Sequence, residues 1–373
     1  MRFDELDLED EILDGLEDMN FHEMTPVQEH TIPVILEGRD IIGCAQTGTG
    51  KTAAYTLPLL NKLLIEGNPD NVVKSLIIVP TRELAQQIDQ QFQGFSYYAP
   101  LSTTVVYGGG DGKGWDIQKN GMLNGADVVI ATPGRLIAHL QNSGVDLSHV
   151  KYFVLDEADR MLDMGFIHDI RRLLPLLPGQ RQTLLFSATM PKTIERLAAD
   201  LLNDPVRVAV EPVASVVDTI EQRLCYVEKP EKKQALISAL KENDGRSVLV
   251  FSRTKHGADR IARIVSKAGI GCDAIHGDKS QTARQRALSN FKAGKTRVIV
   301  ATDIAARGID IDQLEMVINY DLPDVAETYV HRIGRTGRAG HSGMALTFCA
   351  SDERPMLADI QKLTGKKLRV IAG

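Results

Sequence analysis

The chain has 373 residues, of which 43% are hydrophobic and 25% are charged, as in an ordinary globular protein rather than a disordered one. This length is more than one hydrophobic core normally serves, so two domains are expected. No run of about 18 or more apolar residues is present and the acidic start lacks a signal-peptide core, so we expect no membrane association. The formal net charge of −6 points away from a broadly basic surface, so any case for a nucleic-acid site must rest on local features.

The N-terminal segment carries much of the acidic excess. Acidic residues crowd positions 4–18, while Leu8, Ile12 and Leu16 recur at the spacing of one helix face. This pattern predicts a solvated amphipathic helix.

Short runs rich in Val, Ile and Leu recur along the chain, and stretches with helical periodicity lie between them. Most runs are continuously apolar rather than alternating, as expected for strands buried on both faces. Strand and helix in alternation predict parallel sheets in doubly wound α/β domains. The predicted strands are 40–43, 76–79, 103–107, 128–131, 152–155, 183–186, 248–251, 272–275, 297–301, 316–320 and 344–348, and the clearest helices are 83–92, 194–202 and 258–268.

The two halves of the chain resemble each other weakly. Residues 76–82 resemble residues 248–254, and residues 129–135 resemble residues 299–303. We therefore expect two copies of one α/β fold. The predicted boundaries are an N-terminal domain over 1–208, a linker over 209–222 and a C-terminal domain over 223–373. Open parallel sheets bind ligands beyond the carboxyl ends of their strands, which is where the polar motifs of this chain fall.

A glycine-rich stretch follows the first predicted strand and ends in Gly50-Lys51-Thr52. Glycines let backbone N–H groups surround phosphates, Lys51 would reach the β- and γ-phosphates, and Thr52 would place its hydroxyl on Mg²⁺. Ala45 stands where the usual pattern has glycine, and a flexible glycine turn is the alternative reading. The predicted ATP-binding residues of this stretch are Gln46, Thr47, Gly48, Thr49, Gly50, Lys51 and Thr52.

An acidic pair follows the apolar run 152–155. Asp156 is predicted to hold Mg²⁺, together with Thr52, and Glu157 to polarise the attacking water as a general base. Acidic residues also favour the first turn of a helix, so a capping cluster is the alternative.

Residues 156–159 read Asp-Glu-Ala-Asp, and with this motif the chain resembles the DEAD-box RNA helicases. Further motifs of that family occur along the chain in the family's order, at residues 80–85, 132–135, 187–189, 301–310 and 331–338. The resemblance implies two tandem RecA-like domains and an ATP-dependent RNA helicase, in which RNA-stimulated ATP hydrolysis drives domain closure and local unwinding of short duplexes.

Two segments, residues 166–172 and 253–258, most resemble the bacterial RhlE-type branch of that family. This finer resemblance implies ribosomal precursors or RNA-decay proteins as partners, besides single-stranded and short duplex RNA.

The resemblance also assigns roles around the nucleotide. Gln28 would present a donor and an acceptor to the adenine edge, and Phe21 would offer a ring for stacking, unless it is simply part of the core. Asp310 would contact the ribose. Arg335 and Arg338 resemble arginine fingers, which stabilise charge on the transferring phosphoryl group.

The implied RNA contacts are mostly small residues and backbone amides with a few arginines. Such groups bind phosphates and 2′-hydroxyls and read no base sequence, although each is also an ordinary turn residue. They are Pro80, Thr81, Arg82, Gly109, Thr132, Gly134, Arg135, Arg253 and Thr302. The resemblance implies that Ser187 and Thr189 couple ATP hydrolysis to strand separation. It implies that His331 links the ATP and RNA sites, and a packed histidine is the alternative.

The four cysteines, Cys44, Cys225, Cys272 and Cys349, lie far apart and form no C-x-x-C pair. This spacing argues against a zinc site or a disulfide framework and favours a reducing compartment, so we expect a cytoplasmic protein.

Two alternative functions stay open from the sequence. One is a DNA helicase with the same two domains, whose ATP hydrolysis would be stimulated by DNA. A non-enzymatic RNA clamp would be expected to have lost Lys51, Glu157 or an arginine finger, and all are present.

Overall fold

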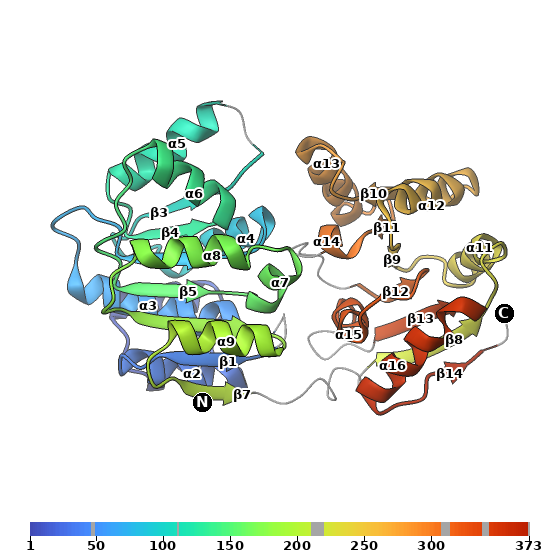
Figure 1. Cartoon of the computed structure of the whole chain (residues 1–373), viewed down its shortest axis with the longest axis horizontal. Helices are drawn as coiled ribbons and strands as arrows, with labels where there is room; N and C mark the ends of the chain where they lie inside the picture. Colours follow the sequence, from blue (N-terminus) through green and yellow to red (C-terminus); the bar gives the residue numbers. More distant parts are fainter. Residues whose placement is uncertain (46–48, 110–111, 210–219, 307–313, 338–342, 372–373) are drawn as a thin grey trace. The chain divides into compact units, whose positions relative to one another are not determined.

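The computed structural model describes residues 1–45, 49–109, 112–209, 220–306, 314–337 and 343–371. The chain divides into two compact units, Met1–Val210 and Glu211–Gly373 (Figure 1). Each unit is a seven-stranded sheet with helices on both of its faces, and every neighbouring pair of strands is parallel. The predicted α/β class with two tandem RecA-like domains is confirmed.

The sheet of the N-terminal unit has the strand order β3-β4-β2-β5-β6-β1-β7. Its strands are β1 (Ile41–Cys44), β2 (Ser75–Ile78), β3 (Thr103–Val106), β4 (Val128–Ala131), β5 (Tyr152–Leu155), β6 (Gln182–Ser187) and β7 (Val206–Ala209). Strands β2, β4, β5 and β6 are buried along their whole length, which is why they read as continuous apolar runs in the sequence.

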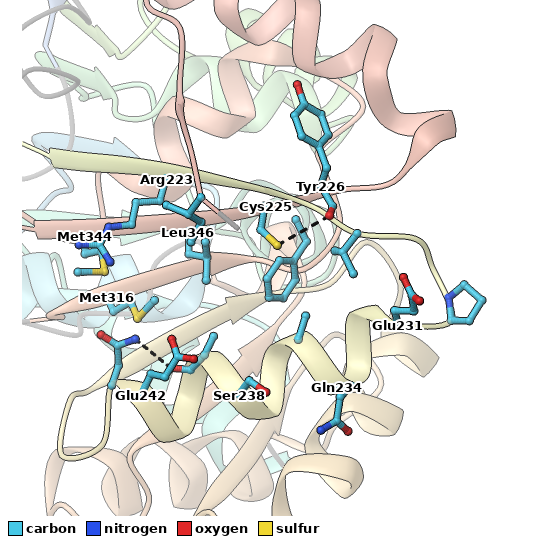
Figure 2. A pocket seen from close by; sticks show the side chains of 17 residues that line it. Arg223, Cys225, Tyr226, Glu231, Gln234, Ser238, Glu242, Met316, Met344 and Leu346 are labelled. Carbon is cyan, nitrogen blue, oxygen red and sulfur yellow. Dashed lines mark hydrogen bonds between the residues drawn. The ribbon is translucent and has the colours of Figure 1, made fainter. Parts of the chain in front are cut away.

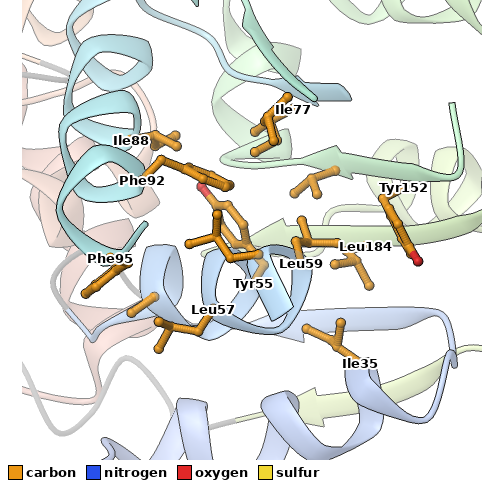
Figure 3. Packing of buried hydrophobic residues seen from close by; sticks show 14 of the residues in the cluster. Ile35, Tyr55, Leu57, Leu59, Ile77, Ile88, Phe92, Phe95, Tyr152 and Leu184 are labelled. Carbon is orange, nitrogen blue, oxygen red and sulfur yellow. The ribbon is translucent and has the colours of Figure 1, made fainter. Parts of the chain in front are cut away.

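Helices cover both faces of this sheet, and alternate strand residues enter two separate cores. Figure 3 shows the first core, to which Tyr55, Phe92 and Phe95 of the helices and Ile77 and Leu184 of the sheet contribute. The helices are α1 (Asp10–Asp18), α2 (Pro26–Leu36), α3 (Lys51–Glu66), α4 (Arg82–Phe95), α5 (Gly112–Leu123), α6 (Pro133–Asn142), α7 (Ala158–Asp163), α8 (Ile167–Leu173) and α9 (Lys192–Leu201). Short 3₁₀ helices lie at Phe3–Glu5 and Leu174–Leu176.

The C-terminal unit repeats this arrangement, with the strand order β10-β11-β9-β12-β13-β8-β14. Its strands are β8 (Ile220–Tyr226), β9 (Val248–Phe251), β10 (Cys272–Ile275), β11 (Val298–Ala301), β12 (Met316–Asn319), β13 (Gly343–Cys349) and β14 (Arg369–Val370). Its helices are α11 (Lys232–Glu242), α12 (Lys255–Lys267), α13 (Gln281–Lys292), α14 (Asp303–Ala306), α15 (Ala326–Ile333) and α16 (Arg354–Thr364), with a 3₁₀ turn at Ser351–Glu353. The matching strand orders explain why the two halves of the sequence resemble each other.

Three strands have no counterpart among the predicted ones: β7, β8 and β14. Strand β8 begins at Ile220, inside the segment predicted as a linker, and its polar residues Glu221, Gln222 and Arg223 hide it from a search for apolar runs. Strand β14 is two residues long and β7 is an edge strand, so neither needs a fully apolar sequence.

The N-terminal amphipathic helix is found as α1, with Ile12 and Leu16 buried. None of the helices in the described ranges has the length and apolar character that crossing a bilayer requires.

Candidate functional site

The glycine-rich stretch reaches helix α3 through Gly50. This residue has a left-handed backbone (φ 89°), and a Cβ atom there would lie 2.6 Å from Nε2 of Gln28. Gln28 Nε2 donates a hydrogen bond to the Gly50 carbonyl oxygen at 3.0 Å, which ties helix α2 to the start of α3. Thr49 and Gly50 lie next to Lys51, the first residue of α3, whereas Gln46, Thr47 and Gly48 lie outside the described residues.

The two residues of the predicted adenine site, Gln28 and Phe21, both contact other protein groups. Gln28 Oε1 accepts a hydrogen bond from the Thr25 backbone N–H at 2.8 Å, so contacts with described residues use one lone pair and one N–H of this amide. The Phe21 ring packs edge-on against Phe95 at 5.2 Å and lies near Phe3. These contacts are those of the core alternative, and the adenine role of Phe21 stays a prediction.

Lys51 and Asp156 form the buried centre of the site. The Lys51 side chain is 6% exposed, and its Nζ has no hydrogen-bond partner in the described part of the chain. Asp156, at the end of β5, is 2% exposed and accepts a hydrogen bond from the Tyr55 hydroxyl at 2.9 Å. Burial raises the pKa of Asp156, the Lys51 charge opposes the rise, and Glu157 adds to it.

Tyr55 is a site residue that the sequence analysis missed. It lies one helical turn after Lys51, so α3 presents both side chains on one face. Burial raises the pKa of Tyr55 well above its usual value, so the phenol keeps its proton and acts as the donor to Asp156. The i, i+4 spacing from the Gly-Lys-Thr motif was the available signal.

This arrangement fits a magnesium–nucleotide complex. An ammonium group that is buried without a partner is costly, and phosphate oxygens would satisfy it. No group of three or more His, Cys, Asp or Glu side chains suited to a metal occurs among the described residues. Mg²⁺ does not need one, because it binds through one or two carboxylates together with substrate phosphates.

Glu157 is held in an unusual conformation beside Asp156. Its backbone is left-handed (φ 56°), which is uncommon for a residue other than glycine. Its N–H donates to Asp156 Oδ1 at 2.8 Å, and its carboxylate forms an ion pair with Arg160. Arg160, which the sequence analysis did not single out, therefore orients the predicted general base.

The fourth residue of the Asp-Glu-Ala-Asp motif binds the two hydroxyl residues that were predicted to couple the sites. The Thr189 N–H and hydroxyl both donate to Asp159 Oδ2, at 2.8 and 2.9 Å. The Asp159 N–H donates to Ser187 Oγ at 3.1 Å, and the Ser187 hydroxyl donates to the Thr189 carbonyl oxygen at 2.7 Å. The structure thus brings Ser187 and Thr189 onto the acidic motif.

The predicted RNA contacts of the N-terminal unit share one sheet edge. Pro80, Thr81 and Arg82 follow β2, Gly109 follows β3, and Thr132, Gly134 and Arg135 follow β4, and these three strands are neighbours. Thr81 accepts a hydrogen bond from the Leu84 N–H at 3.3 Å and so begins helix α4.

Both arginines of this edge lie over aromatic rings. The Arg82 guanidinium carbon is 4.3 Å from the centre of the Tyr107 ring, and that of Arg135 is 4.4 Å from the centre of Trp115. Gly109 has a left-handed backbone (φ 89°), which favours glycine there.

In the C-terminal unit the predicted residues fall on or just after α15 and β11. Thr302 follows β11, His331 lies on α15 and is half-buried, and Arg335 is buried just beyond α15. Asp310 and Arg338 lie outside the described residues.

A neighbour of these residues, Arg332, is fully buried and structural. It binds both carboxylate oxygens of Asp303, at 2.6 and 2.8 Å, and the Asp321 carbonyl oxygen at 2.6 Å. The sequence motif alone does not distinguish this arginine from its neighbours.

Arg253, which follows β9 and is the other predicted RNA contact of this unit, is engaged by protein groups. Its Nη2 donates to the Leu322 carbonyl oxygen at 3.0 Å and to Glu353 Oε1 at 3.1 Å, and its Nε lies 3.5 Å from Asp324 Oδ1. Glu353 also pairs with the buried Lys232 at 2.6 Å. The Arg253 charge is therefore shared with carboxylates, which the sequence did not indicate.

Comparison with known proteins agrees with this geometry. The family model of DEAD/DEAH box helicases matches residues 25–197, and that of the helicase conserved C-terminal domain matches residues 231–340. The ATP-dependent RNA helicase CshA of Listeria monocytogenes is 43% identical over 368 residues, which cover 99% of this chain and 70% of the relative. The chain belongs to the DEAD-box ATP-dependent RNA helicase family.

Other helicases of the family are similar over the whole chain. The ATP-dependent rRNA helicase RRP3 of Kluyveromyces lactis is 42% identical, covering 98% of this chain and 74% of the relative. The solved structure of Saccharomyces cerevisiae Dbp5 bound to RNA and ADP BeF3 has a TM-score of 0.87 and 31% identity, covering 100% of this chain and 95% of that one. These relatives are of other types than the RhlE branch, so that finer resemblance is not shown.

A separate pocket of 630 Å³ opens in the C-terminal unit between α11 and the sheet (Figure 2). Met316, Met344 and Leu346 line it from the sheet side, and Gln234 and Glu242 line it from α11. None of its lining residues is a predicted helicase-site residue, so this pocket is not part of the candidate site.

Proposed function

We propose that this helicase binds ATP with Mg²⁺ and single-stranded RNA, that RNA stimulates hydrolysis, and that closure of the two units separates short duplexes locally. The observation that carries the proposal is the buried Nζ of Lys51, which has no hydrogen bond to a described residue and whose charge acts on Asp156 of the Asp156–Glu157 pair. A further support is that Dbp5, a similar protein, has been solved with RNA and ADP BeF3.

The chemistry proposed for the nucleotide site is water attack on the γ-phosphate. Mg²⁺, when bound, neutralises phosphate charge, with Thr52 and Asp156 as the residues that would hold it. Glu157, oriented by Arg160, accepts a proton from the attacking water. The left-handed backbone of Glu157 is a strain of the kind found at catalytic sites.

The remaining nucleotide contacts would complete this site only on closure. Arg335 and Arg338 would stabilise the charge on the transferring phosphoryl group, and Asp310 would contact the ribose. ATP and RNA both favour the closed state in this scheme, so each should tighten binding of the other by the same factor.

Coupling between the ATP and RNA sites is proposed to run through Asp159. This residue is bonded to Ser187 and Thr189 and adjoins the pair that handles Mg²⁺ and water. A change at the γ-phosphate therefore has a short hydrogen-bonded route to the loop after β6. His331 would serve the same coupling from the C-terminal unit.

RNA would be bound through its backbone and without base specificity. The residues at the shared sheet edge of the N-terminal unit are suited to phosphates and 2′-hydroxyls. Residues 166–172 and 253–258 support membership of the RhlE-type branch. That branch would have ribosomal precursors or RNA-decay proteins as partners. The cysteines, which form no disulfide, support a cytoplasmic location.

The test is ATP hydrolysis measured without nucleic acid, with single-stranded RNA and with single-stranded DNA of the same sequence. Glu157→Gln serves as the blank, because it keeps the size of the side chain and removes the base. Stimulation by RNA alone, lost in the variant, is the expected result. Equal stimulation by DNA would make this a general nucleic-acid motor, and no hydrolysis with either would leave a non-enzymatic clamp.

A further inference from the structure

The single tryptophan of the chain, Trp115, lies on α5 beside a predicted RNA contact. The Arg135 guanidinium carbon lies over its ring at 4.4 Å. The imidazole of His139 stacks on the same indole, with ring centres 3.7 Å apart and planes 22° apart. Trp115 belongs to none of the helicase motifs and to none of the predicted sites, so the motif set leaves this cluster unexplained.

Gln118, on the same helix, ties the cluster to the sheet edge. Its Oε1 accepts a hydrogen bond from Arg135 Nε at 2.9 Å and lies 3.1 Å from His139 Nε2. Its Nε2 donates to the Tyr107 carbonyl oxygen at 3.0 Å, where β3 ends. The Gln118 side chain is only 7% exposed, so its three contacts hold it in place.

His139 supports the Trp115 ring as a neutral imidazole and adds no charge to the cluster. It is fully buried, and burial, with smaller contributions from the charges of Arg135 and Lys119, lowers its pKa to about 4. The imidazole is therefore neutral at ordinary pH and does not repel the neighbouring guanidinium. It acts as a flat support for the indole.

These contacts fix Arg135 without neutralising it. Its Nε is used by Gln118 and its plane lies over Trp115, but Nη2 is buried and has no hydrogen-bond partner in the described part of the chain. None of the ion pairs between described residues joins Arg135 to a carboxylate. A planar guanidinium that is held in one orientation loses little side-chain entropy when it binds an anion.

We propose that Trp115 is a positioning residue for RNA binding, which with Gln118 holds the half-buried Arg135 guanidinium in one orientation for a phosphate of the RNA backbone. The inference rests on the proposed RNA contact of Arg135. Trp115 acts through Arg135 and is not itself a contact for a base, because its ring already carries the Arg135 and His139 contacts.

The first experiment measures the affinity of the full chain for fluorescein-labelled single-stranded RNA with Mg²⁺, ADP and beryllium fluoride. Trp115→Ala should weaken binding about 3- to 10-fold, and Trp115→Phe less, because a smaller ring still faces the guanidinium. Ile117→Ala is the matched control, since Ile117 lies on the same helix and is 72% exposed. The midpoint of thermal unfolding and RNA-free hydrolysis are followed to separate positioning from loss of structure.

A double-mutant cycle decides the role of Trp115. In an Arg135→Ala background, Trp115→Ala should weaken RNA binding no further, because the group that it positions is gone. Full additivity, or no effect of Trp115→Ala while Arg135→Ala weakens binding, would overturn the inference and leave the proposed function intact. No effect of Arg135→Ala would remove the RNA contact itself, and with it this inference.

Trp115 also supplies a signal of its own. Because no other tryptophan is present, the indole emission reports this site alone. Unlabelled RNA should change the emission of the wild type, and Arg135→Ala should abolish the change. A change of the same size in Arg135→Ala would contradict a positioning role.

Discussion

Two arginines that the sequence places in the same role have opposite surroundings in the fold. Arg135 of the N-terminal unit is held by neutral groups, the Trp115 ring and the Gln118 amide. Arg253 of the C-terminal unit binds the buried carboxylate of Glu353 and lies near Asp324. A guanidinium with neutral partners keeps its charge for a phosphate, whereas one paired with carboxylates mainly stabilises its own domain.

Two buried lysines make the same contrast. Lys51 Nζ has no hydrogen-bond partner in the described ranges, whereas Lys232 Nζ binds Glu353 at 2.6 Å and the Tyr320 carbonyl oxygen at 2.7 Å. An unpaired buried charge marks a ligand site, and a paired one marks a structural element. Lys51 of the N-terminal unit therefore stays available for a ligand, whereas Lys232 of the C-terminal unit stabilises its own domain.

The largest expected effect is the loss of folding stability in Lys232→Met. The substitution leaves Glu353 buried without its main cationic partner, so the free energy of unfolding of the C-terminal unit should fall by about 3–5 kcal/mol. Urea denaturation measures this. Adding Glu353→Gln should restore part of the loss, because the unpaired charge is removed, and equal stability of Lys232→Met and the wild type would show that the network is not structural.

The next largest effect is on catalysis, in Lys51→Met. Hydrolysis of ATP should fall by about 10²- to 10³-fold, as for removal of one group that stabilises transition-state charge. The free energy of unfolding should fall far less than in Lys232→Met, because the removed ammonium has no hydrogen bond to any described residue and only its charge acts on Asp156. A steady-state assay and urea denaturation on the same preparation separate the two. A loss of stability in Lys51→Met as large as that in Lys232→Met would break the contrast.

A smaller effect is expected on RNA affinity when the two arginines are compared. Arg135→Ala should weaken binding of single-stranded RNA about tenfold and reduce the slope of log affinity against log salt by about 0.7. Arg253→Ala should change affinity less, because its guanidinium is already engaged by Glu353. Fluorescence anisotropy over a range of salt concentrations measures both, and a larger loss in Arg253→Ala would reverse the assignment.

The last effect concerns pH and His139, and it is confined to acidic pH. The pKa of this residue is about 4 in the fold, below its ordinary value of 6.5, so the unfolded chain takes up the proton first as pH falls. His139 therefore leaves the free energy of unfolding unchanged above about pH 6.5 and lowers it as the pH falls from 6.5 to 4. His139→Gln, which has no such proton, should lose less stability than the wild type over this window. Equal losses would mean that His139 is not buried as described.

Much of the fold follows from local sequence. Continuous apolar runs predict buried parallel strands, and their repetition predicts two similar units, because burial on both faces leaves no polar position in a strand. Strand β8 was not predicted, because it is not a continuous apolar run. Its residues Glu221 and Arg223 are partly exposed and pair with each other.

The sequence by itself determined the class of fold and the family, and it predicts the residues that meet ATP, because the residues of the Gly-Lys-Thr and Asp-Glu-Ala-Asp motifs lie close together in the chain. Only the tertiary structure decided the partners of these residues. Tyr55 reaches Asp156 across 101 positions of sequence, and Glu353 reaches Arg253 across 100. Such contacts depend on how helices pack on the sheet, and they decide which buried cations stay available for a phosphate.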